Sequence, residues 1–581
     1  MSMEEFNQMS HYLVDRISYW AKECPDDIAM IDADEGQYIT WKQFENAINL
    51  RALELMTGMG FQKGDIMITM LPLLPEHIYM EYAAFKIGMI VCPLDVRLKS
   101  REVVGCVKLL HKARRILYLA PDDTDSEDKY GRAKFYAFKQ IADDVRDVCP
   151  YVRDFIQLGP EEDAAKGTIG ILNFLKRARR KWLEYKAIGM LEQKLVMLEQ
   201  RKQSVVPDKD GAMIIFTTGS TGFPKPAVLS NAGLICQNMC MIKGFGIRKT
   251  DRLLLNLPMS HVAAQGVGLM SVIFAGGLLV LLHGFRADKS LQAIQDYKTT
   301  IFGQIPALFA MEWSLPNFKD YDLSSVRMAL YGAQGMTRNQ LEKFSELAPL
   351  MATGLGMTEM CGFVSYQLGD RMAIDDFVSG LGHDFPVTPV SVREPMNPDG
   401  TAGKEIPQGQ TGEICYTGPQ VFLGYYDNEE VTRKTISKEG ILYTGDMGFV
   451  DEAGLHLAGR RKFILKPKGY QVYPAEVENY IAEKFKDRAE IVGVIGLPHE
   501  IFSEGIMAFI ERKPGKTIDP VEVIEACKDL AAYKRPSHVV IMDPEQMPLN
   551  RTEKTDYMVL KKIGEKEVAQ LRAKGKWDAA K

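Results

Sequence analysis

A short stretch at residues 217–226, TTGSTGFPKP, has the composition of an anion-binding loop. Glycines let successive backbone N–H groups turn toward one point, and hydroxyl groups add further hydrogen-bond donors. A lysine supplies a formal positive charge. The candidate ligand residues are Thr217, Thr218, Gly219, Ser220, Thr221, Gly222 and Lys225. Together these groups suit an oligophosphate.

The P-loop of kinases and NTPases is one alternative for this stretch, and its spacing does not match. That motif needs Gly-Lys-Ser/Thr in direct succession at the start of a helix. Here Phe223 and Pro224 separate Gly222 from Lys225, and Pro226 follows. An ordinary Gly/Ser loop remains the alternative for a match of this kind in isolation.

The segments around the loop predict the elements that position it. The apolar run GAMIIF (211–216) predicts a strand, and the residues from Asn231 onward predict a helix. Upstream, DIMITML (65–71), EHIYMEYAAFKIG (76–88) and IVCPLD (90–95) alternate between apolar β-branched runs and amphipathic stretches. This rhythm is typical of an α/β fold, in which helices cover a mostly parallel sheet.

Bulk composition narrows the class of protein. A chain of 581 residues is too long for one ordinary core, so several subdomains are expected. Hydrophobic residues at 46% and charged residues at 25% are typical of a soluble globular protein. The net charge of −5 gives no reason to expect nucleic acid or an anionic membrane as a partner. The nine cysteines do not have the spacing of a zinc site. The acidic start MSMEEFNQMS lacks an apolar signal region, so we expect a cytoplasmic protein.

Two segments have unusual composition. The uncharged run VGLMSVIFAGGLLVLL (267–282) is shorter than the roughly 20 residues of a membrane span, and two glycines interrupt it. It predicts a buried helix, a tight turn and a buried strand. Residues 161–203, with KRARRKWLEYKA and LEQKLVMLEQRKQ, predict a charged, solvent-facing helix or helix pair. A nucleic-acid patch is less favoured there because acidic residues interrupt the basic ones.

The stretch LAGRRKFILKPKGYQVYPAEVENYI (457–481) has the pattern of a domain boundary. A Gly-Arg turn precedes a basic hairpin, and a helix then begins with proline in its first turn. We predict an N-terminal body over 1–458, a hinge at 459–462 and a C-terminal lid over 463–581. The lid is long enough for a small α+β domain.

The loop and seven further stretches resemble, in the same order, the motifs of the adenylate-forming superfamily, which includes acyl-CoA synthetases, firefly luciferase and peptide-synthetase adenylation domains. These stretches are ITWKQF, GFQKGDIMITMLPLLPE, LPMSHV, GLGMTE, GYYDNEEVT with YTGD, GRRKFILKPKGY and PLNRTEKTD. The resemblance extends from about Ile39 to Lys554. It implies a body of parallel-sheet α/β layers with a small β-barrel, followed by a mobile lid.

The resemblance also implies a reaction in two halves. A carboxylate attacks the α-phosphate of ATP to give an acyl-adenylate and pyrophosphate, and a thiol, here coenzyme A, then displaces AMP. By the same resemblance, Lys554 bridges the acid and the α-phosphate, Thr358 contacts that phosphate, and Glu359 holds Mg²⁺, a hard ion suited to carboxylate oxygen. His261 gates and positions the acid.

Further roles follow from the resemblance residue by residue. Adenine is expected to contact Gly332, Ala333, Gln334, Gly354, Leu355, Gly356 and Met357. The ribose is expected to contact Asp446 and Arg460. CoA is expected to contact Lys468, Gly469 and Tyr470, and the hinge is expected at Lys462. Three positions depart from the family pattern. Pro226 and Glu553 stand where glycine is usual, and Leu355 stands where most members stack an aromatic ring on adenine.

The expected acid pocket is small and apolar, formed by Ala263, Gly266, Gly303 and Tyr331. Peptide-synthetase domains place an aspartate just after the histidine motif, but HVAAQGVG (261–268) contains no acid. Since burying an unpaired ammonium is costly, an amino-acid substrate is disfavoured. We expect an alicyclic, aromatic or short- to medium-chain acid, with the direction of reaction open and a homodimer allowed. The alternatives are a ligase that loads an acyl carrier protein, a luciferase-like oxygenase, and a non-catalytic nucleotide-binding protein.

Overall fold

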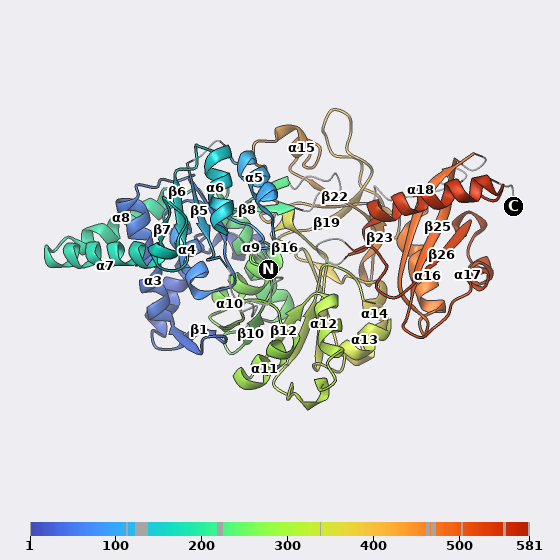
Figure 1. Cartoon of the computed structure of the whole chain (residues 1–581), viewed down its shortest axis with the longest axis horizontal. Coiled ribbons are helices and arrows are strands. Elements are labelled where there is room, and N and C mark those ends of the chain that lie inside the picture. Colours follow the sequence, from blue (N-terminus) through green and yellow to red (C-terminus); the bar gives the residue numbers. More distant parts are fainter. Residues whose placement is uncertain are drawn as a thin grey trace.

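The protein consists of a large body and a small C-terminal domain beside it (Figure 1). The computed structural model describes residues 2–111, 114–122, 138–217, 225–336, 338–460, 465, 467, 472–500, 503–549 and 554–578, without the side chains of Ser379, Arg460 and Ser503. Apolar residues between Phe6 and Leu455 form the clusters that make up the core of the body. Residues from Leu465 onward form clusters of their own.

The first sheet of the body has the order β18-β17-β14-β13-β12-β10-β11-β1-β2. Its strands are β1 (Ile28–Asp32), β2 (Gln37–Thr40), β10 (Arg252–Leu255), β11 (Leu278–Leu281), β12 (Ile301–Gln304), β13 (Met328–Tyr331), β14 (Leu350–Thr353), β17 (Ser365–Gly369) and β18 (His383–Asp384). The strands from β1 to β14 in this order run parallel, whereas β2, β17 and β18 pair antiparallel. Burial on both faces explains why the parallel strands are nearly continuous apolar runs.

The second sheet has the order β21-β9-β8-β4-β3-β5-β6-β7. Its strands are β3 (Ile66–Met70), β4 (Ile90–Pro93), β5 (Arg115–Leu119), β6 (Asp154–Gln157), β7 (Ile169–Gly170), β8 (Gly211–Thr217), β9 (Lys225–Ser230) and β21 (Gly424–Tyr425). The strands predicted at 65–71, 90–95 and 211–216 are confirmed as β3, β4 and β8. All pairs from β7 to β8 are parallel, and β9 pairs antiparallel with both β8 and β21.

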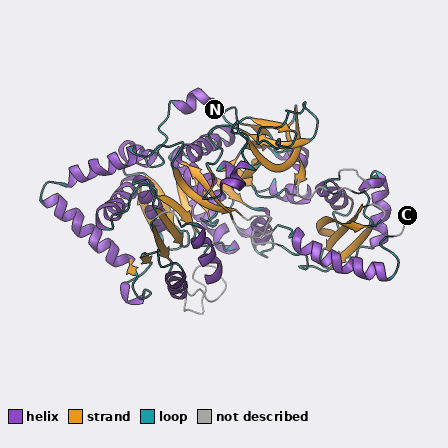
Figure 2. Ribbon diagram, turned by 90° about the horizontal axis from the view of Figure 1, so that it is seen from above, coloured by secondary structure: helices purple, strands orange, loops and turns teal. Residues whose placement is uncertain are grey.

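Helices cover both sheets, as the α/β pattern predicts (Figure 2). They are α1 (Met3–Asn7), α2 (Asp15–Glu23), α3 (Trp41–Leu53), α4 (Pro75–Lys86), α5 (Ser100–Leu109), α6 (Phe138–Val148), α9 (Asn231–Phe245), α11 (Ala287–Tyr297), α12 (Pro306–Trp313), α13 (Arg338–Phe344), α14 (Ile374–Ser379) and α15 (Glu429–Arg433). The helix expected from Asn231 onward is confirmed as α9. Ser230 caps it, because its hydroxyl accepts a hydrogen bond from the Gly233 N–H.

The uncharged run at 267–282 folds as predicted into a buried helix, a turn and a strand. The π-helix η3 (Ala263–Leu269) continues into α10 (Met270–Ala275), and β11 follows. Gly276 ends the helix in the left-handed conformation, at φ +78°, which glycine adopts without strain. Among the described residues, no helix is long and apolar enough to cross a membrane.

The charged segment at 161–203 contains the expected helix pair, α7 (Ile171–Ala187) and α8 (Leu191–Gln203). The two helices extend outward from the body at its end farthest from the C-terminal domain (Figures 1 and 2).

The all-β part of the body is an antiparallel sheet in the order β19-β20-β22-β23, which stands where a small β-barrel is expected. Its strands are β19 (Val390–Arg393), β20 (Gly412–Tyr416), β22 (Leu442–Asp451) and β23 (Gly454–Arg460). A short ladder of β15 (Gly356–Met357) and β16 (Gly362–Phe363) flanks the 3₁₀ turn η5 (Thr358–Met360).

The C-terminal domain is of the α+β type, as predicted. Its sheet has the order β24-β25-β26, and three helices pack with it. The elements are α16 (Pro474–Lys484), β24 (Ala489–His499), β25 (Ser503–Arg512), α17 (Pro520–Ala526), β26 (His538–Met542) and α18 (Tyr557–Ala573). Pro474 occupies the first turn of α16, which confirms the helix start read from the sequence.

Candidate active site

The residues expected to contact nucleotide and acid gather at one edge of the first sheet. Gly303 lies near the carboxyl end of β12, Tyr331 ends β13, and Gly354 directly follows β14. These strands are parallel neighbours, so their carboxyl ends meet at the same edge. In open α/β sheets that edge is the usual ligand-binding edge.

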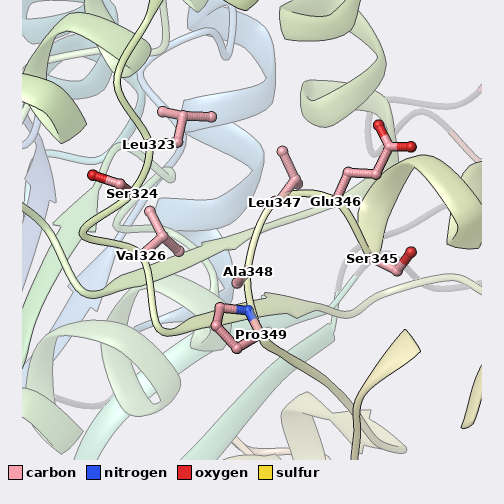
Figure 3. Close-up of a pocket in the computed structure, with 8 residues that line it drawn as sticks. All are labelled: Leu323, Ser324, Val326, Ser345, Glu346, Leu347, Ala348 and Pro349. Carbon is pink, nitrogen blue, oxygen red and sulfur yellow. The ribbon is translucent and has the colours of Figure 1, made fainter. Parts of the chain in front are cut away.

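A surface hollow elsewhere in the body is not this site (Figure 3). It has a volume of about 500 Å³ and is lined by Leu323, Ser324, Val326, Ser345, Glu346, Leu347, Ala348 and Pro349. Val326 precedes β13 and Pro349 precedes β14. The hollow therefore lies at the amino ends of the strands, opposite to the edge where the predicted residues gather.

The turn that carries Gly354 and Leu355, two of the residues expected to contact adenine, is fixed by its backbone. A Cβ atom on Gly354 would lie 2.1 Å from the Ser365 carbonyl oxygen, so only glycine fits. The Leu355 N–H donates to the Ser365 hydroxyl at 2.8 Å, and its carbonyl accepts from the Val364 N–H at 2.8 Å. The Leu355 side chain is half-buried and can offer apolar contact only.

The buried Gln420 side chain anchors the segment after this turn, residues 360–363, and this role was not predicted from the sequence. Its amide donates to the carbonyl oxygens of Met360 at 3.2 Å and Phe363 at 3.0 Å, and to the Gln237 side chain at 2.6 Å. Only folding brings residues 360–363 and 420 together, so no local pattern marked it.

The remaining residues expected at adenine lie around these turns. Gly332, Ala333 and Gln334 follow β13, and Ala333 has a left-handed backbone with φ +73°. Ala333 and Gln334 are exposed at the edge of the sheet, as is Gly356, while Met357 is half-buried and directly precedes Thr358.

Tyr425, whose role the sequence did not predict, contacts both Glu359 and Lys225. The Tyr425 hydroxyl donates to Glu359 Oε1 at 2.7 Å. Lys225 Nζ lies 5.3 Å from the centre of the Tyr425 ring. Burial and the Glu359 charge raise the pKa of Tyr425, so it remains a hydrogen-bond donor. The carboxylate and the lysine thus approach one ring from η5 and β9.

The phosphate loop is only partly described. Thr218, Gly219, Ser220, Thr221 and Gly222 lie outside the described residues. Thr217 is the last residue of β8 and pairs in register with Lys225, and Phe216 pairs with Pro226. Lys225 and Pro226, expected in the loop, therefore begin strand β9. Proline is tolerated at the start of a strand, and its carbonyl accepts from the Tyr426 N–H at 2.8 Å.

His261 and Lys554 come from different domains and lie near each other. The Ala263 N–H donates to His261 Nδ1 at 3.1 Å, so a neutral ring carries its proton on Nε2. Burial and the nearby Lys554 charge lower the pKa of His261 to about 4. The ring is therefore neutral at pH 7. A second contact joins the domains, because the Asn339 amide donates to the Lys486 carbonyl at 3.3 Å.

The expected pocket residues differ in the space around them. A Cβ atom on Gly266 would lie 2.5 Å from the Cys361 carbonyl oxygen, whereas one on Gly303 would meet nothing closer than 3.7 Å. Ala263 is half-exposed at the start of η3. Tyr331 is 2% exposed, and its ring packs on Phe344 in the core at a centroid distance of 5.2 Å. Any contact of Tyr331 with a substrate would therefore use its backbone.

A buried carboxylate lies behind the pocket helix, although the histidine-motif segment itself contains none. Glu81 and Gln265 are both 0% exposed. The Gln265 amide donates to both Glu81 oxygens, at 3.0 and 2.9 Å, and His77 Nε2 lies 3.1 Å from Glu81 Oε1. This carboxylate is engaged by protein groups and is not available to pair a substrate ammonium.

The expected ribose carboxylate belongs to the antiparallel sheet of the body. Asp446 is 4% exposed, and its N–H donates to the Thr444 hydroxyl at 3.0 Å. It pairs in register with Arg460 across β22 and β23, which aligns the two residues expected at the ribose. The Arg460 side chain lies outside the described part of the chain, as do Lys462, Lys468, Gly469 and Tyr470.

Next to Gly303, a buried glutamate gives a prediction for stability. Glu312 is 1% exposed, and its Oε1 accepts from the Gln304 amide at 3.0 Å. Burial raises the pKa of Glu312 to about 8. The folded state therefore binds a proton that the unfolded chain releases above about pH 4.5, and this group makes the fold less stable as pH rises toward 8.

Replacing Glu312 by glutamine should remove this dependence. We expect the difference in free energy of unfolding, Glu312→Gln minus wild type, to increase by on the order of 3–5 kcal/mol between pH 5 and pH 9. Denaturant unfolding at both pH values measures the difference. If the free energies of unfolding of the two proteins changed equally with pH, the raised pKa of the buried Glu312 would be contradicted.

Comparison with known proteins agrees with this architecture. The family model of AMP-binding enzymes matches residues 17–426, and the model of the AMP-binding enzyme C-terminal domain matches residues 476–554. 4-coumarate–CoA ligase 2 of Nicotiana tabacum is 28% identical over 514 residues, covering 85% of either chain. Long-chain-fatty-acid–CoA ligase of Yersinia pestis is 26% identical over 520 residues, covering 87% of either chain.

The fold is shared with solved structures. ATP-bound MatB from Rhodopseudomonas palustris superposes with a TM-score of 0.75 at 23% identity, covering 96% of this chain and 99% of that one. The matched part of the body includes Glu359, and the matched part of the C-terminal domain includes Lys554. The chain belongs to the family of AMP-binding enzymes.

Proposed function

We propose that the protein is an AMP-forming acyl-CoA synthetase, which converts a carboxylic acid, ATP and CoA into acyl-CoA, AMP and diphosphate. The main support is the position of Lys554, which the C-terminal domain brings close to His261 of the body. Two anions must approach each other in the first half-reaction, so the site needs fixed positive charge at that point. The names of the related CoA ligases support the choice of thiol.

In the first half-reaction, a carboxylate oxygen of the acid forms a bond to the α-phosphorus of ATP. The bond from that phosphorus to the β-phosphate oxygen breaks, and diphosphate leaves with the electron pair. Lys554 offsets the repulsion between the acid and the α-phosphate. His261 is neutral and carries its proton on Nε2, so it can donate one hydrogen bond to orient the acid but does not act as a charged acid.

Glu359 fits a magnesium site. It is a hard oxygen donor, and it accepts a hydrogen bond from Tyr425, the tyrosine whose ring Lys225 also approaches and near which phosphates are expected. A magnesium ion held there would offset the negative charge on the phosphates of ATP.

The second half-reaction requires a different arrangement of the domains. CoA sulfur must reach the carbonyl carbon of the acyl-adenylate, and AMP leaves with the bridging oxygen. In the first arrangement Lys554 lies on the acid and phosphate side, and the residues expected to bind CoA, 468–470, lie outside the described residues. We propose that rotation at Lys462 withdraws Lys554 after adenylation, because hinges absorb such motions at a few residues. Since a thioester and a phosphoanhydride are close in energy, concentrations set the direction.

The acid has an uncharged tail, alicyclic, aromatic or short- to medium-chain aliphatic. Gly303 gives a test, because a side chain there has room within the protein and would enter the expected pocket. We expect Gly303→Val to lower kcat/KM for the largest accepted acid by about 10–200-fold, with little change for acetate. Gly335→Ala is the matched control, because nothing lies within 4 Å of its added Cβ. Equal losses for all acids would contradict the pocket assignment.

The proposed function is tested by incubating the protein with ATP, Mg²⁺, CoA and a panel of acids. The panel contains benzoate, cyclohexane carboxylates and straight chains from acetate to decanoate. AMP and acyl-CoA formed in equal amounts with one group support the proposal and identify the acid. Acid-dependent exchange of diphosphate into ATP without acyl-CoA would point to a carrier-protein ligase. No AMP and no exchange with any acid would overturn the proposal in favour of a nucleotide-binding protein.

A further inference from the structure

The helices α7 and α8 form a hairpin (residues 171–203) whose outer half has no buried residue. Ile171, Phe174 and Ala178 of α7 and Leu198 and Lys202 of α8 are buried at its base. Between residues 179 and 197, all of which the structure describes, every side chain is exposed or half-exposed. This outer half, the hairpin tip, projects away from the body in both views (Figures 1 and 2).

The hairpin is strongly basic in an acidic protein. It contains nine lysine and arginine residues and three glutamates, a net charge of +6, whereas the whole chain carries −5 and the remainder therefore −11. Part of this charge is used internally, because Lys181 and Arg177 lie 3.2 and 3.8 Å from the buried Glu54 carboxylate.

Three exposed bases have no such role. Lys176, Arg179 and Lys186 are exposed and form no ion pair within the described part of the chain. They lie on one face of α7, because positions separated by three or four residues share a helix face.

Apolar side chains interrupt this basic face and continue around the tip. Leu172 and Leu183 share the face of Lys176 and Arg179 and are 48% and 63% exposed. At the tip, Ile188 is 64% exposed, Val196 54% and Met197 39%. Large apolar side chains gathered on an exposed surface indicate an interaction site, and their mixture with bases indicates an amphipathic, negatively charged partner.

We propose that the hairpin docks this enzyme on an anionic lipid bilayer. Lys176, Arg179 and Lys186 bind headgroup phosphates, while Leu183 and Ile188 enter the boundary between headgroups and acyl chains. The acidic remainder of the molecule is repelled by the same surface, so contact is confined to the hairpin. A second copy of this protein, docking through its own hairpin, is disfavoured as the partner because that hairpin carries the same positive charge.

Vesicle co-sedimentation at low ionic strength tests the proposal with the full-length protein. We expect binding to vesicles of equimolar phosphatidylglycerol and phosphatidylcholine, and none to phosphatidylcholine alone. Lys176→Gln/Arg179→Gln/Lys186→Gln should lower the partition coefficient roughly 100-fold, since each base near the surface contributes about a factor of five. Leu183→Asn/Ile188→Asn should also weaken binding, including at high salt.

The matched control is Lys319→Gln/Lys404→Gln/Lys438→Gln, which removes the same charge from three exposed lysines outside the hairpin. It should bind vesicles as wild type does, and circular dichroism verifies that every variant is folded. Three results would overturn the proposal: no binding of wild type to anionic vesicles, equal loss in hairpin and control variants, or a hairpin-dependent dimer in sedimentation velocity without vesicle binding.

Discussion

Replacing Lys554 by alanine is expected to slow acyl-adenylate formation by about 10²–10³-fold, as for other losses of one group that stabilises transition-state charge. Lys554 lies near enough to His261 for its charge to lower the pKa of that ring. An ammonium there offsets the repulsion between the acid and the α-phosphate only during adenylation. Thioester formation from supplied acyl-adenylate should therefore change far less. Acid-dependent exchange of diphosphate into ATP measures the first step, and acyl-CoA release measures the second.

Lys561→Ala is the control for this variant, because Lys561 is an exposed lysine of the same domain. A separate readout does not depend on activity. In Lys554→Ala the pKa of His261 should rise above about 4 but stay below its usual value, because burial, the larger cause of the shift, remains; NMR titration can follow this rise. Equal loss of both half-reactions would contradict a role confined to adenylation, and an unchanged His261 titration would contradict the proximity of the two side chains.

Replacing Glu359 by glutamine is expected to lower kcat/KM for adenylation by a comparable factor, about 10²–10³-fold. The amide oxygen of the introduced glutamine could still accept the hydrogen bond from Tyr425, so Glu359→Gln removes the charge while keeping the contact. If this carboxylate holds magnesium, the Mg²⁺ concentration needed for half-maximal rate should rise as well. Initial rates across a magnesium series at saturating ATP measure this shift.

Two controls separate charge from structure at this position. Tyr425→Phe removes the orienting hydrogen bond and should cost less than Glu359→Gln, at most about 10–100-fold. Glu452→Gln removes an exposed carboxylate elsewhere on the body and should have no effect. A Glu359→Gln enzyme with the magnesium dependence of wild type would place the metal on other residues.

Much of the framework could be predicted from the sequence, because its signals are local. Apolar runs at 65–71 and 211–216 became β3 and β8, the glycine pair at 276–277 separated α10 from β11, and Pro474 began α16. The order of the short motifs indicated the family, which the two family models confirm.

What could not be predicted depends on residues that only folding brings together. Tyr425, Gln420 and Glu81 support the site through partners far away in the sequence, and no spacing marks such contacts. Strand β9 was missed because Lys225 and Pro226 have the composition of a loop, whereas pairing with β8 makes them a strand. The net charge of −5 likewise gives no sign of the local value of +6 on the hairpin, because a sum over the whole chain hides how charge is distributed.

The most direct test of the central claim follows oxygen from the acid. The protein is incubated with ATP, Mg²⁺, CoA and an accepted acid labelled with ¹⁸O in its carboxylate, and the products are analysed by mass spectrometry. If the carboxylate attacks the α-phosphate and the thiol then attacks the carbonyl carbon, one labelled oxygen must appear in AMP and one remain in the thioester. Unlabelled AMP, or label in inorganic phosphate with formation of ADP, would contradict an acyl-adenylate.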